Sequence, residues 1–503
     1  MSHEDRAQPL DLNHGSESER RVAGERTPLI PPPEPLESRE ASTDGEPISN
    51  GFTEHPPAQE EEDVPLPKLQ IFLLSYARMV EPVAFFSIFP FVNQMIFETG
   101  AVKEADVGFW SGLMESLFSL TQTIVMLAWG KAADRWGRKP VLVFSLCGIS
   151  VAVALFGFCK TIWQMILARC FAGVFAGTVV TVRAMFSENS TKKTQARAFS
   201  FFAFASNTGI FIGPLLGGNL QHPAESFPNV FGNVALFKKY PFALPTMVTG
   251  FFALSAAITC GLFIKETLKP KDDREEDEPP MSMLQILKAP GVARVLGIYS
   301  EIFLIVLGSA AVMPVFWFTT IKLGGYSWSP NMISIFLGAG GGSQALWLLL
   351  VFPYLQRSMG TGGVLRACGW IWPFFLAASP LGNLLLRNHW KVAFWSILPA
   401  CHVFGSGVAM SFTAIQLCIN DISPSGSSFG LLNSIALSLV SGLRAFAPVV
   451  FTSIFAIGVR SQVLGGQLIW VLLVAMAILF RFSLKWLPEE AEGRPQKRSS
   501  RVD

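Results

Sequence analysis

Charged residues are scarce in this sequence of 503 residues. Asp, Glu, Lys and Arg make up 15% of it, against about 25% in ordinary soluble domains, whereas half of the residues are hydrophobic. A single soluble protein of this composition would have too little polar surface to cover its core. The formal net charge of +2 adds little, because the charges are segregated along the chain. The composition therefore favours a membrane protein.

The sequence also lacks the motifs of disulfide frameworks, metal sites and nucleotide hydrolysis. Its seven cysteines lie within or beside apolar runs and form no Cys-x-x-Cys, which indicates buried thiols rather than disulfides or a zinc site. Its six histidines are scattered, so no metal site is predicted. No Gly-x-x-x-x-Gly-Lys-Ser/Thr occurs, which excludes ATP hydrolysis by this chain. We therefore expect no cofactor, no nucleic-acid partner and no enzymatic activity.

The first 66 residues are rich in Glu, Pro and Ser and show no apolar periodicity. This composition predicts a disordered acidic tail. Near Met1 there is no basic stretch followed by an apolar one, so we expect no signal peptide. Residues 25–30 read Glu-Arg-Thr-Pro-Leu-Ile and resemble the acidic dileucine signals that sort proteins to the vacuole or lysosome.

Apolar segments long enough to cross a bilayer follow this tail, since about 20 helical residues span its hydrocarbon layer. We predict an all-α membrane protein with twelve transmembrane helices, near residues 69–94, 107–129, 141–159, 162–184, 199–219, 242–264, 294–318, 331–352, 364–386, 391–416, 429–456 and 464–484. A cytoplasmic linker at 265–291, with an acidic run at 272–280, separates a half at 67–264 from a half at 292–487. A basic tail at 488–503 ends the chain.

Basic residues concentrate in every second loop and in the last tail, which places both termini in the cytoplasm by the positive-inside rule. The sequon at 189–191 then lies on the cytoplasmic side, so we expect no glycan there. The vacuolar and plasma membranes are the favoured locations, with the peroxisomal membrane as an alternative, and we expect a monomer.

A loop between spans 2 and 3, residues 130–140, reads Gly-Lys-Ala-Ala-Asp-Arg-Trp-Gly-Arg-Lys-Pro. This order resembles the signature loop of the major facilitator superfamily of secondary transporters, and residues 353–360 form a degenerate copy in the second half. The resemblance implies two six-helix pseudo-repeats with substrate held near the midplane between them. It also implies that Asp134 braces the loop against span 11 and that the loop takes part in the conformational change of transport. The residues of this conformational loop are Gly130, Asp134, Arg135, Gly137, Arg138 and Lys139.

Span 5 contains a glycine pattern that resembles the antiporter motif of proton-coupled drug exporters with twelve spans. It consists of Gly209, Gly213, Pro214, Gly217 and Gly218. Glycines four apart share one helix face and permit close helix packing, so simple packing is the alternative interpretation.

Charged residues inside the spans are candidates for proton coupling, because an intramembrane charge is costly and needs a partner. Arg169 in span 4 matches an Arg-x-x-x-Gly-x-x-x-Gly pattern of the same family, in which this arginine is proposed to assist proton transfer. Glu81 in span 1 and Glu115 in span 2 are candidate proton carriers, and a static pair of Glu81 with Arg78 is the alternative for the former. Glu301 is interpreted as a structural partner of the nearby Arg294.

Further inward polar residues complete the inventory. His402 and Arg444 are interpreted mainly as structural, and the polar side chains that could contact substrate are Gln122, Asn207, Trp317, Gln344 and Asn433. The remaining lining suits an apolar or weakly polar organic molecule.

The prediction is therefore a proton-coupled transporter that exports small, largely apolar organic compounds, such as drugs or secondary metabolites, from the cytosol. It resembles the twelve-span drug:proton antiporters, particularly fungal and plant vacuolar members. An uptake symporter and a membrane receptor that does not transport are the alternatives.

Overall fold

The structure is a computed structural model that describes residues 66–191, 194–268, 282–424 and 429–493. These residues belong to one compact unit, Asp63–Asp503, and the described part is helical without a strand. The dileucine-like segment at 25–30 and the acidic run at 272–280 lie outside the described residues.

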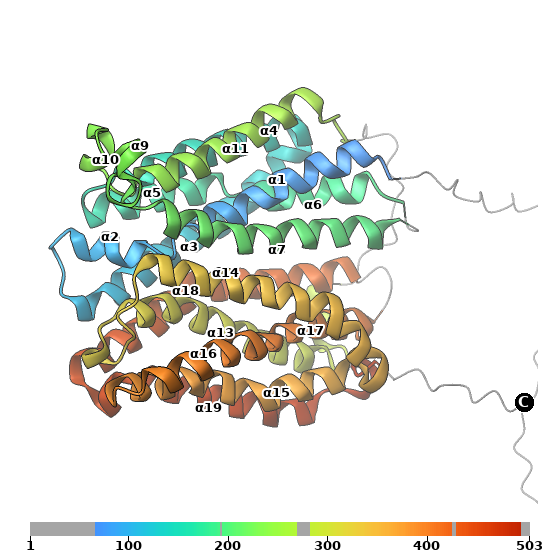
Figure 1. Cartoon of the computed structure of the whole chain (residues 1–503). Helices are drawn as coiled ribbons and strands as arrows, with labels where there is room; N and C mark the ends of the chain where they lie inside the picture. The colour runs from blue at the N-terminus through green and yellow to red at the C-terminus, as the bar shows by residue number, and fades with distance from the viewer. Residues whose placement is uncertain (1–65, 192–193, 269–281, 425–428, 494–503) are drawn as a thin grey trace, which may run out of the picture. The chain divides into compact units, whose positions relative to one another are not determined.

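Two chain segments, before and after the gap at 269–281, contain the helices that Figure 1 draws from blue to green and from yellow-green to red. The first segment contains α1 Lys68–Phe86, α2 Val92–Glu98, η1 Glu104–Asp106, α3 Val107–Trp136, α4 Arg138–Phe156, α5 Ile162–Phe175, α6 Thr178–Glu188, α7 Gln195–Leu220, α8 Pro223–Ser226, α9 Pro228–Phe231, α10 Ala235–Lys239 and α11 Ala243–Phe263. The second contains α12 Met283–Lys288, α13 Val292–Phe318, η3 Ile321–Leu323, α14 Pro330–Leu346, the π-helical η4 Trp347–Val351, α15 Phe352–Arg387, α16 Lys391–Gly405, η5 Ser406–Ala409, α17 Met410–Asp421, α18 Phe429–Ser461, η6 Val463–Gly466, α19 Leu468–Ser483, η7 Leu484–Trp486 and η8 Glu489–Ala491.

Ten helical stretches in the described residues are long and apolar enough to cross a membrane. One of them, Pro330–Arg387, contains two spans that meet at Gly360, where the backbone leaves the helical region with φ 74° and ψ 171°. The helix α3 is not among the ten, although its 30 residues exceed the length of a span. With that pair separated and α3 included, the arrangement of twelve spans predicted from the sequence is confirmed.

Several predicted spans are interrupted in the structure. The first predicted span ends as α1 at Phe86, and the chain then turns before the short helix α2 begins at Val92. The fourth is divided into α5 and α6 at Gly177, where a Cβ would lie 2.4 Å from the Trp129 ring. Such breaks are tolerated in membrane proteins where neighbouring helices satisfy the freed backbone groups.

Gly137 and Gly360 occupy equivalent positions in the signature loop and in its degenerate copy. Gly137 has φ 105° and separates α3 from α4, and Gly360 has φ 74° and bends α15. Glycine adopts such positive φ values without the steric cost that a Cβ would impose. The faint repeat in the sequence therefore marks a real correspondence of backbone conformation.

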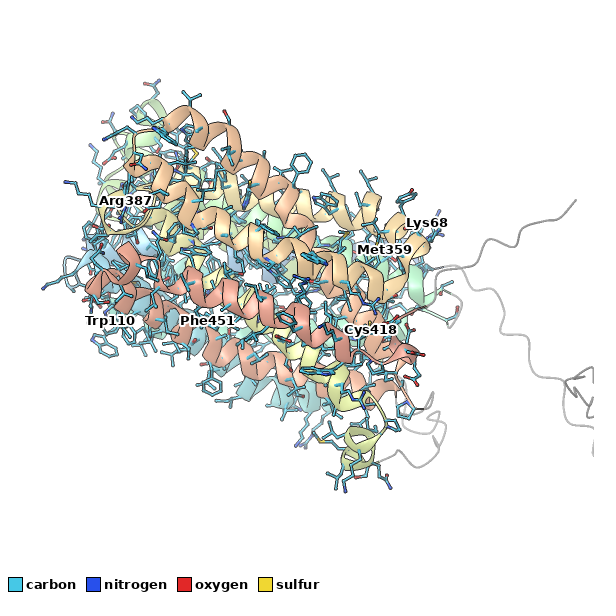
Figure 2. All side chains as sticks on the ribbon, turned by 90° about the horizontal axis from the view of Figure 1, so that it is seen from below. Lys68, Trp110, Met359, Arg387, Cys418 and Phe451 are labelled. Atoms are coloured by element: carbon cyan, nitrogen blue, oxygen red, sulfur yellow. The ribbon has the colours of Figure 1, made fainter. Side chains whose placement is uncertain are left out.

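The helices run between two ends of the unit. Figure 2 shows Lys68, Met359 and Cys418 toward one end and Trp110 and Arg387 toward the other. We call the first the motif end, because α1 begins there and the signature loop follows α3 there, and the second the opposite end. In Figure 1 the short helices α8, α9 and α10 lie at the opposite end.

The two helical segments contact each other mainly through α3 against α18 and α7 against α14. Small residues permit this close approach: a Cβ on Gly112 would lie 1.9 Å from the Thr452 hydroxyl, and one on Gly218 would lie 2.3 Å from the Ser334 Cβ. Spans 2 and 11, and spans 5 and 8, therefore form the interface between the halves.

Hydrogen bonds across this interface extend from its middle to the opposite end. The Ser116 hydroxyl accepts from the Val449 backbone N–H at 3.0 Å, and the Glu104 carboxylate accepts from the Thr320 backbone N–H at 2.7 Å. The other contacts between polar groups of the two halves join Thr123 to Ser441, Gln221 to Asn331, and Asp106 to Arg460 as an ion pair. Among the described residues no such bond joins the halves at the motif end.

Candidate functional site

The signature loop is held by two carboxylates from its own half of the chain. Arg138 forms ion pairs with Asp134 at 2.8 Å and with Glu188, at the end of α6, at 3.1 Å. The Glu188 carboxylate also accepts from the Thr267 hydroxyl at 2.5 Å. The last turn of span 4 is thereby connected both to the loop and to the chain after span 6.

Glu266 caps the first turn of α4 from outside the helix. Its carboxylate accepts from the backbone N–H groups of Arg138 and Lys139 at 2.8 and 3.0 Å, and from those of Thr267 and Leu268. Partial burial would raise the pKa of Glu266, but these four hydrogen bonds outweigh it, so the pKa lies below its ordinary value. A negative charge at a helix N-terminus is also favoured by the helix dipole.

The brace that the family resemblance implies for Asp134 is not made in this structure. The Asp134 side chain is 58% exposed and pairs with Arg138 four residues later, not with any described residue of α18. Gly130 has open space around it, and Arg135 is exposed. The residues that hold the loop, Glu188 and Glu266, were missed in the sequence, where the only signal is an acidic residue at the end of a span beside a basic loop.

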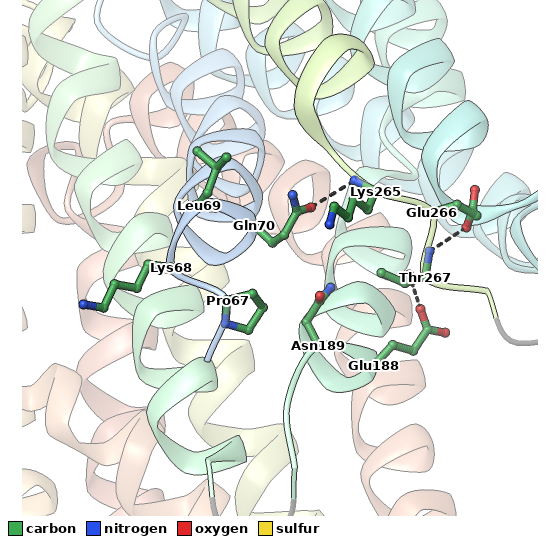
Figure 3. A pocket seen from close by; sticks show the side chains of 9 residues that line it. All are labelled: Pro67, Lys68, Leu69, Gln70, Glu188, Asn189, Lys265, Glu266 and Thr267. Carbon is green, nitrogen blue, oxygen red and sulfur yellow. Dashed lines mark hydrogen bonds between the residues drawn. The ribbon is translucent and has the colours of Figure 1, made fainter. Parts of the chain in front are cut away.

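A pocket of about 520 Å³ also lies at the motif end (Figure 3). It is lined by Glu188, Glu266 and the first residues of α1, and the Gln70 side chain beside it accepts from the Lys265 backbone N–H at 3.0 Å. All of its lining residues precede the gap at 269–281. This pocket therefore lies apart from the interface between the halves, where the family resemblance implies substrate binding.

Glu81 lies in a buried polar cluster in the middle of the first half. Its two carboxylate oxygens accept from the Gln122 amide at 2.8 Å and from the Thr178 hydroxyl at 3.3 Å. Arg78 approaches at 3.6 Å and donates a hydrogen bond to the Ser206 hydroxyl at 3.0 Å. Spans 1, 2 and 4 therefore meet at this carboxylate, and Arg78, its most distant partner, joins it to Ser206 of span 5.

Glu115 and Arg169 lie beside a second, smaller pocket, which Phe85, Phe89 and Met114 also line. Arg169 is 5% exposed, and its guanidinium lies over the Phe118 ring at 4.4 Å from the centroid. Among the described residues Glu115 has no hydrogen bond or ion pair, although it interacts electrostatically with Arg169. The structure thus brings together two of the residues predicted to couple protons, Glu115 on span 2 and Arg169 on span 4.

The glycines of the span 5 pattern face other helices closely. A Cβ on Gly209 would lie 2.7 Å from the Met79 backbone oxygen, one on Gly213 3.0 Å from that of Val83, and one on Gly217 1.7 Å from that of Ser87. These glycines therefore let α7 pack directly on the backbone of α1, while Pro214 lies inside the same helix.

The predicted substrate contacts do not form one group. Gln122 belongs to the Glu81 cluster, whereas Trp317 is 3% exposed and packs on Trp328 and His402 in an aromatic core of the second half. Asn433 accepts from the Gln416 amide at 2.6 Å. Asn207 and Gln344 lie half-buried on spans 5 and 8.

Glu301 has a different partner from the one expected. Its carboxylate accepts from the Ser483 hydroxyl of α19 at 2.6 Å, and no ion pair with Arg294 occurs between these two described residues. Span 7 is thereby joined to span 12, away from the cluster around Glu81.

Residues 74–445 match the family model described as Major Facilitator Superfamily. The chain belongs to this superfamily. Its members are transporters rather than enzymes, which agrees with the signature loop and with the arrangement of twelve spans.

Individual relatives and a solved structure extend this match. The chain is 45% identical over 478 residues to the efflux pump azaK of Aspergillus niger, covering 95% of this chain and 97% of that protein. It is 25% identical over 466 residues to the major facilitator-type transporter psiT2 of Psilocybe cyanescens, covering 82% of this chain and 88% of the relative. The solved structure of a bacterial homolog to the human lysosomal transporter Spinster, inward-facing and unoccupied, shares the fold with a TM-score of 0.59 at 14% identity, covering 86% and 99% of the two chains.

A further cluster of polar residues in this major facilitator chain lies at the opposite end, away from the signature loop. His222 has an αL backbone, and its ring forms ion pairs with Glu98 at 3.2 Å and with Glu225 at 3.9 Å, while Gln94 donates to Glu98 at 2.6 Å. The hydrogen bond to Glu98 raises the pKa of His222, burial opposes this, and the charges of Glu98 and Glu225 add to the rise. The contact joins α2 to the segment after span 5.

This pair should make stability depend on pH. Because the folded pKa of His222 is raised, its stabilisation is fully present below the ordinary histidine pKa near 6.5 and is lost as pH rises through the folded value. We expect Glu98→Gln to lower stability by about 0.5 kcal/mol at pH 5.5, since the pair is partly exposed and screened, and by nothing measurable well above the folded pKa. Thermal unfolding of purified protein from pH 5.5 to 9 measures this. Glu225→Gln, at the more distant and exposed carboxylate, is the matched control, and an equal loss at all pH values would contradict the expectation.

Proposed function

We propose that this major facilitator protein is a proton-coupled exporter of small organic compounds. The observation that carries the proposal is the buried carboxylate of Glu81, which lies in the membrane-spanning part and accepts hydrogen bonds from spans 2 and 4. The similarity to an efflux pump over nearly the whole chain supports the direction of transport.

Proton coupling follows from how such a carboxylate responds to its surroundings. A carboxyl group shielded from water favours its neutral form, whereas water or a nearby cation favours the ionised form. The Gln122 amide donates to Glu81 and Arg78 lies within ion-pair range, so both partners stabilise its charge. A change in the spacing of spans 1, 2 and 4 would change these contacts.

Glu115 with Arg169 forms a second candidate for the same step. The pair lies on spans 2 and 4 and borders a pocket, so water that enters there reaches both groups. Protonation of Glu115 would remove the carboxylate charge that acts on the guanidinium of Arg169 among the described residues. We propose that Glu81 carries the transported proton and that Glu115 and Arg169 assist.

The motif end is the proposed cytoplasmic side. The distribution of basic residues supports this orientation, with both termini in the cytoplasm. We also propose that the protein is a monomer in the vacuolar or plasma membrane. Bonds between the halves lie from the middle to the opposite end in the described residues, so this conformation would open toward the cytoplasm. The chain is thus poised to receive a cytosolic substrate.

Flux measured in proteoliposomes tests the proposal. We expect an organic substrate to move against its gradient when protons flow in the opposite direction, and to stop when an ionophore dissipates the pH gradient. Movement of substrate in the same direction as protons would instead establish a symporter, and flux that ignores the pH gradient would reject proton coupling.

A further inference from the structure

Arginines outnumber carboxylates in the membrane-spanning region where the two halves meet. Arg78, Arg169, Arg183 and Arg444 lie on spans 1, 4 and 11, and each interacts electrostatically with at least one of the others. The carboxylates near them in the described residues are Glu81 and Glu115. Even with both glutamates ionised, the region keeps two uncompensated positive charges.

Two of the arginines have partners. Arg78 lies 3.6 Å from Glu81, donates to Ser206 and lies over the Phe202 ring. Arg169 is buried beside Glu115, between the Phe85 and Phe118 rings. Glu115 also interacts electrostatically with Arg444, so Glu81 and Glu115 together balance two of the four positive charges.

Arg183 and Arg444 have no hydrogen bond or ion pair with the residues that the structure describes. The guanidinium of Arg183 lies 5.9 Å from the centroid of the Phe199 ring, and its charge acts on Tyr299 of the other half. That of Arg444 lies 5.3 Å from the centroid of the Phe85 ring, again across the interface between the halves. Both side chains are partly exposed, so a molecule that enters between the halves can reach them.

An unpaired guanidinium in a low-dielectric region is costly, and arginine cannot escape the cost by losing its proton. Its planar array of N–H donors matches a carboxylate or a similar oxyanion, and it stacks on aromatic rings. We propose that Arg444 binds an anionic group of the transported substrate, so that the substrate class is an organic anion with an apolar body. The inference rests on the proposed export function and specifies its substrate.

The apolar part of such a substrate has a surface to contact. Phe85 lies beside Arg444 and also lines the pocket of Glu115, in contact with Phe86 and Phe89. Aromatic side chains beside a cation suit a molecule that combines rings with one negative charge. A substrate with rings and one negative charge agrees with the apolar lining predicted from the sequence. It differs from that prediction in that the substrate must also carry a negative charge.

A pair of fluorescent probes that differ only in charge tests this inference by binding alone. Dansyl-glycine carries a carboxylate and dansyl-glycinamide is neutral, and the purified full-length protein is titrated with each while dansyl fluorescence is recorded. We expect the anion to bind at least tenfold more tightly. Arg444→Gln should remove about tenfold in affinity for the anion and leave the amide unchanged, and Arg444→Lys should restore part of the loss.

Arg481→Gln is the matched control, because this arginine lies on span 12 over the Trp370 ring, away from the interface. Equal affinity for the two probes, no binding of the anion, or an equal loss for both probes in Arg444→Gln would overturn the inference. Because binding is measured without a pH gradient, retained anion preference together with absent pH-driven flux would reject the proposed coupling and leave the anion site standing.

Discussion

Gly217→Ala is expected to remove most of the folded protein. The added Cβ would lie 1.7 Å from the backbone oxygen of Ser87, at the turn that follows α1, and a backbone atom cannot rotate away as a side chain can. Helices α7 and α1 would have to separate along a line of glycine contacts. Overpacking in a well-packed core costs roughly 1–3 kcal/mol, and we expect the upper end or beyond, because the clash is with backbone. Thermal unfolding and the yield of monodisperse protein in detergent measure the loss.

A matched control separates this clash from the effect of an alanine in a membrane helix. Gly442 lies inside α18, and a Cβ there would meet nothing within 4 Å. Gly442→Ala should therefore leave yield and stability unchanged or slightly higher, because alanine favours helix more than glycine does. Similar behaviour of the two variants would show that the close approach at Gly217 does not determine stability.

Glu81→Gln is expected to bind substrate normally and to lose its response to a pH gradient. Glutamine has the shape of the protonated carboxyl group, and its oxygen can still accept from the Gln122 amide, so the cluster should persist. Without a group that releases a proton, pH-driven export should fall to the rate of passive exchange. A single set of proteoliposomes reports protein abundance, substrate binding and pH-driven flux together.

The alternative for Glu81 is a static ion pair with Arg78, and it predicts a different result. Loss of that pair would leave the Arg78 charge buried and lower abundance, because breaking a buried pair typically costs about 3–5 kcal/mol. The 3.6 Å separation and the second contact of Arg78 with Ser206 favour the coupling role. Glu301→Gln, at a carboxylate held by Ser483, is the control that should keep full coupling. If pH-driven flux persists in Glu81→Gln, this residue does not carry the transported proton, and Glu115 becomes the next candidate.

The fold was largely predictable because the membrane imposes length and hydrophobicity on each span. The limits of span 6, predicted as 242–264, agree with α11 at Ala243–Phe263, where the apolar run is uninterrupted. Prediction was poorer for span 1, because the turn after Phe86 occurs within a sequence that remains apolar. The membrane constrains the length and hydrophobicity of a span, but it does not determine where the backbone of that span bends.

Individual site residues were identifiable from the sequence, but their partners were not. An acidic residue inside an apolar segment, such as Glu81 or Glu115, can be recognised from the sequence as a candidate site residue. Nothing in the sequence, however, indicates that Glu266 accepts from the backbone of Arg138, which lies 128 residues earlier. The contact of Asp134 with Arg138 in this structure was not predicted either, since a local pattern identifies a loop without identifying what the loop contacts.

The position of Arg78 and Glu81 in the first span has a consequence for how the chain is made. Span 1 enters the membrane before spans 2, 4 and 5 have been synthesised, so Gln122, Thr178 and Ser206 are not yet available to these charges. An arginine at the centre of a helix costs about 2.5–3.5 kcal/mol during insertion by the translocon. The first span therefore gains the partners of these two charges only after later spans have been inserted.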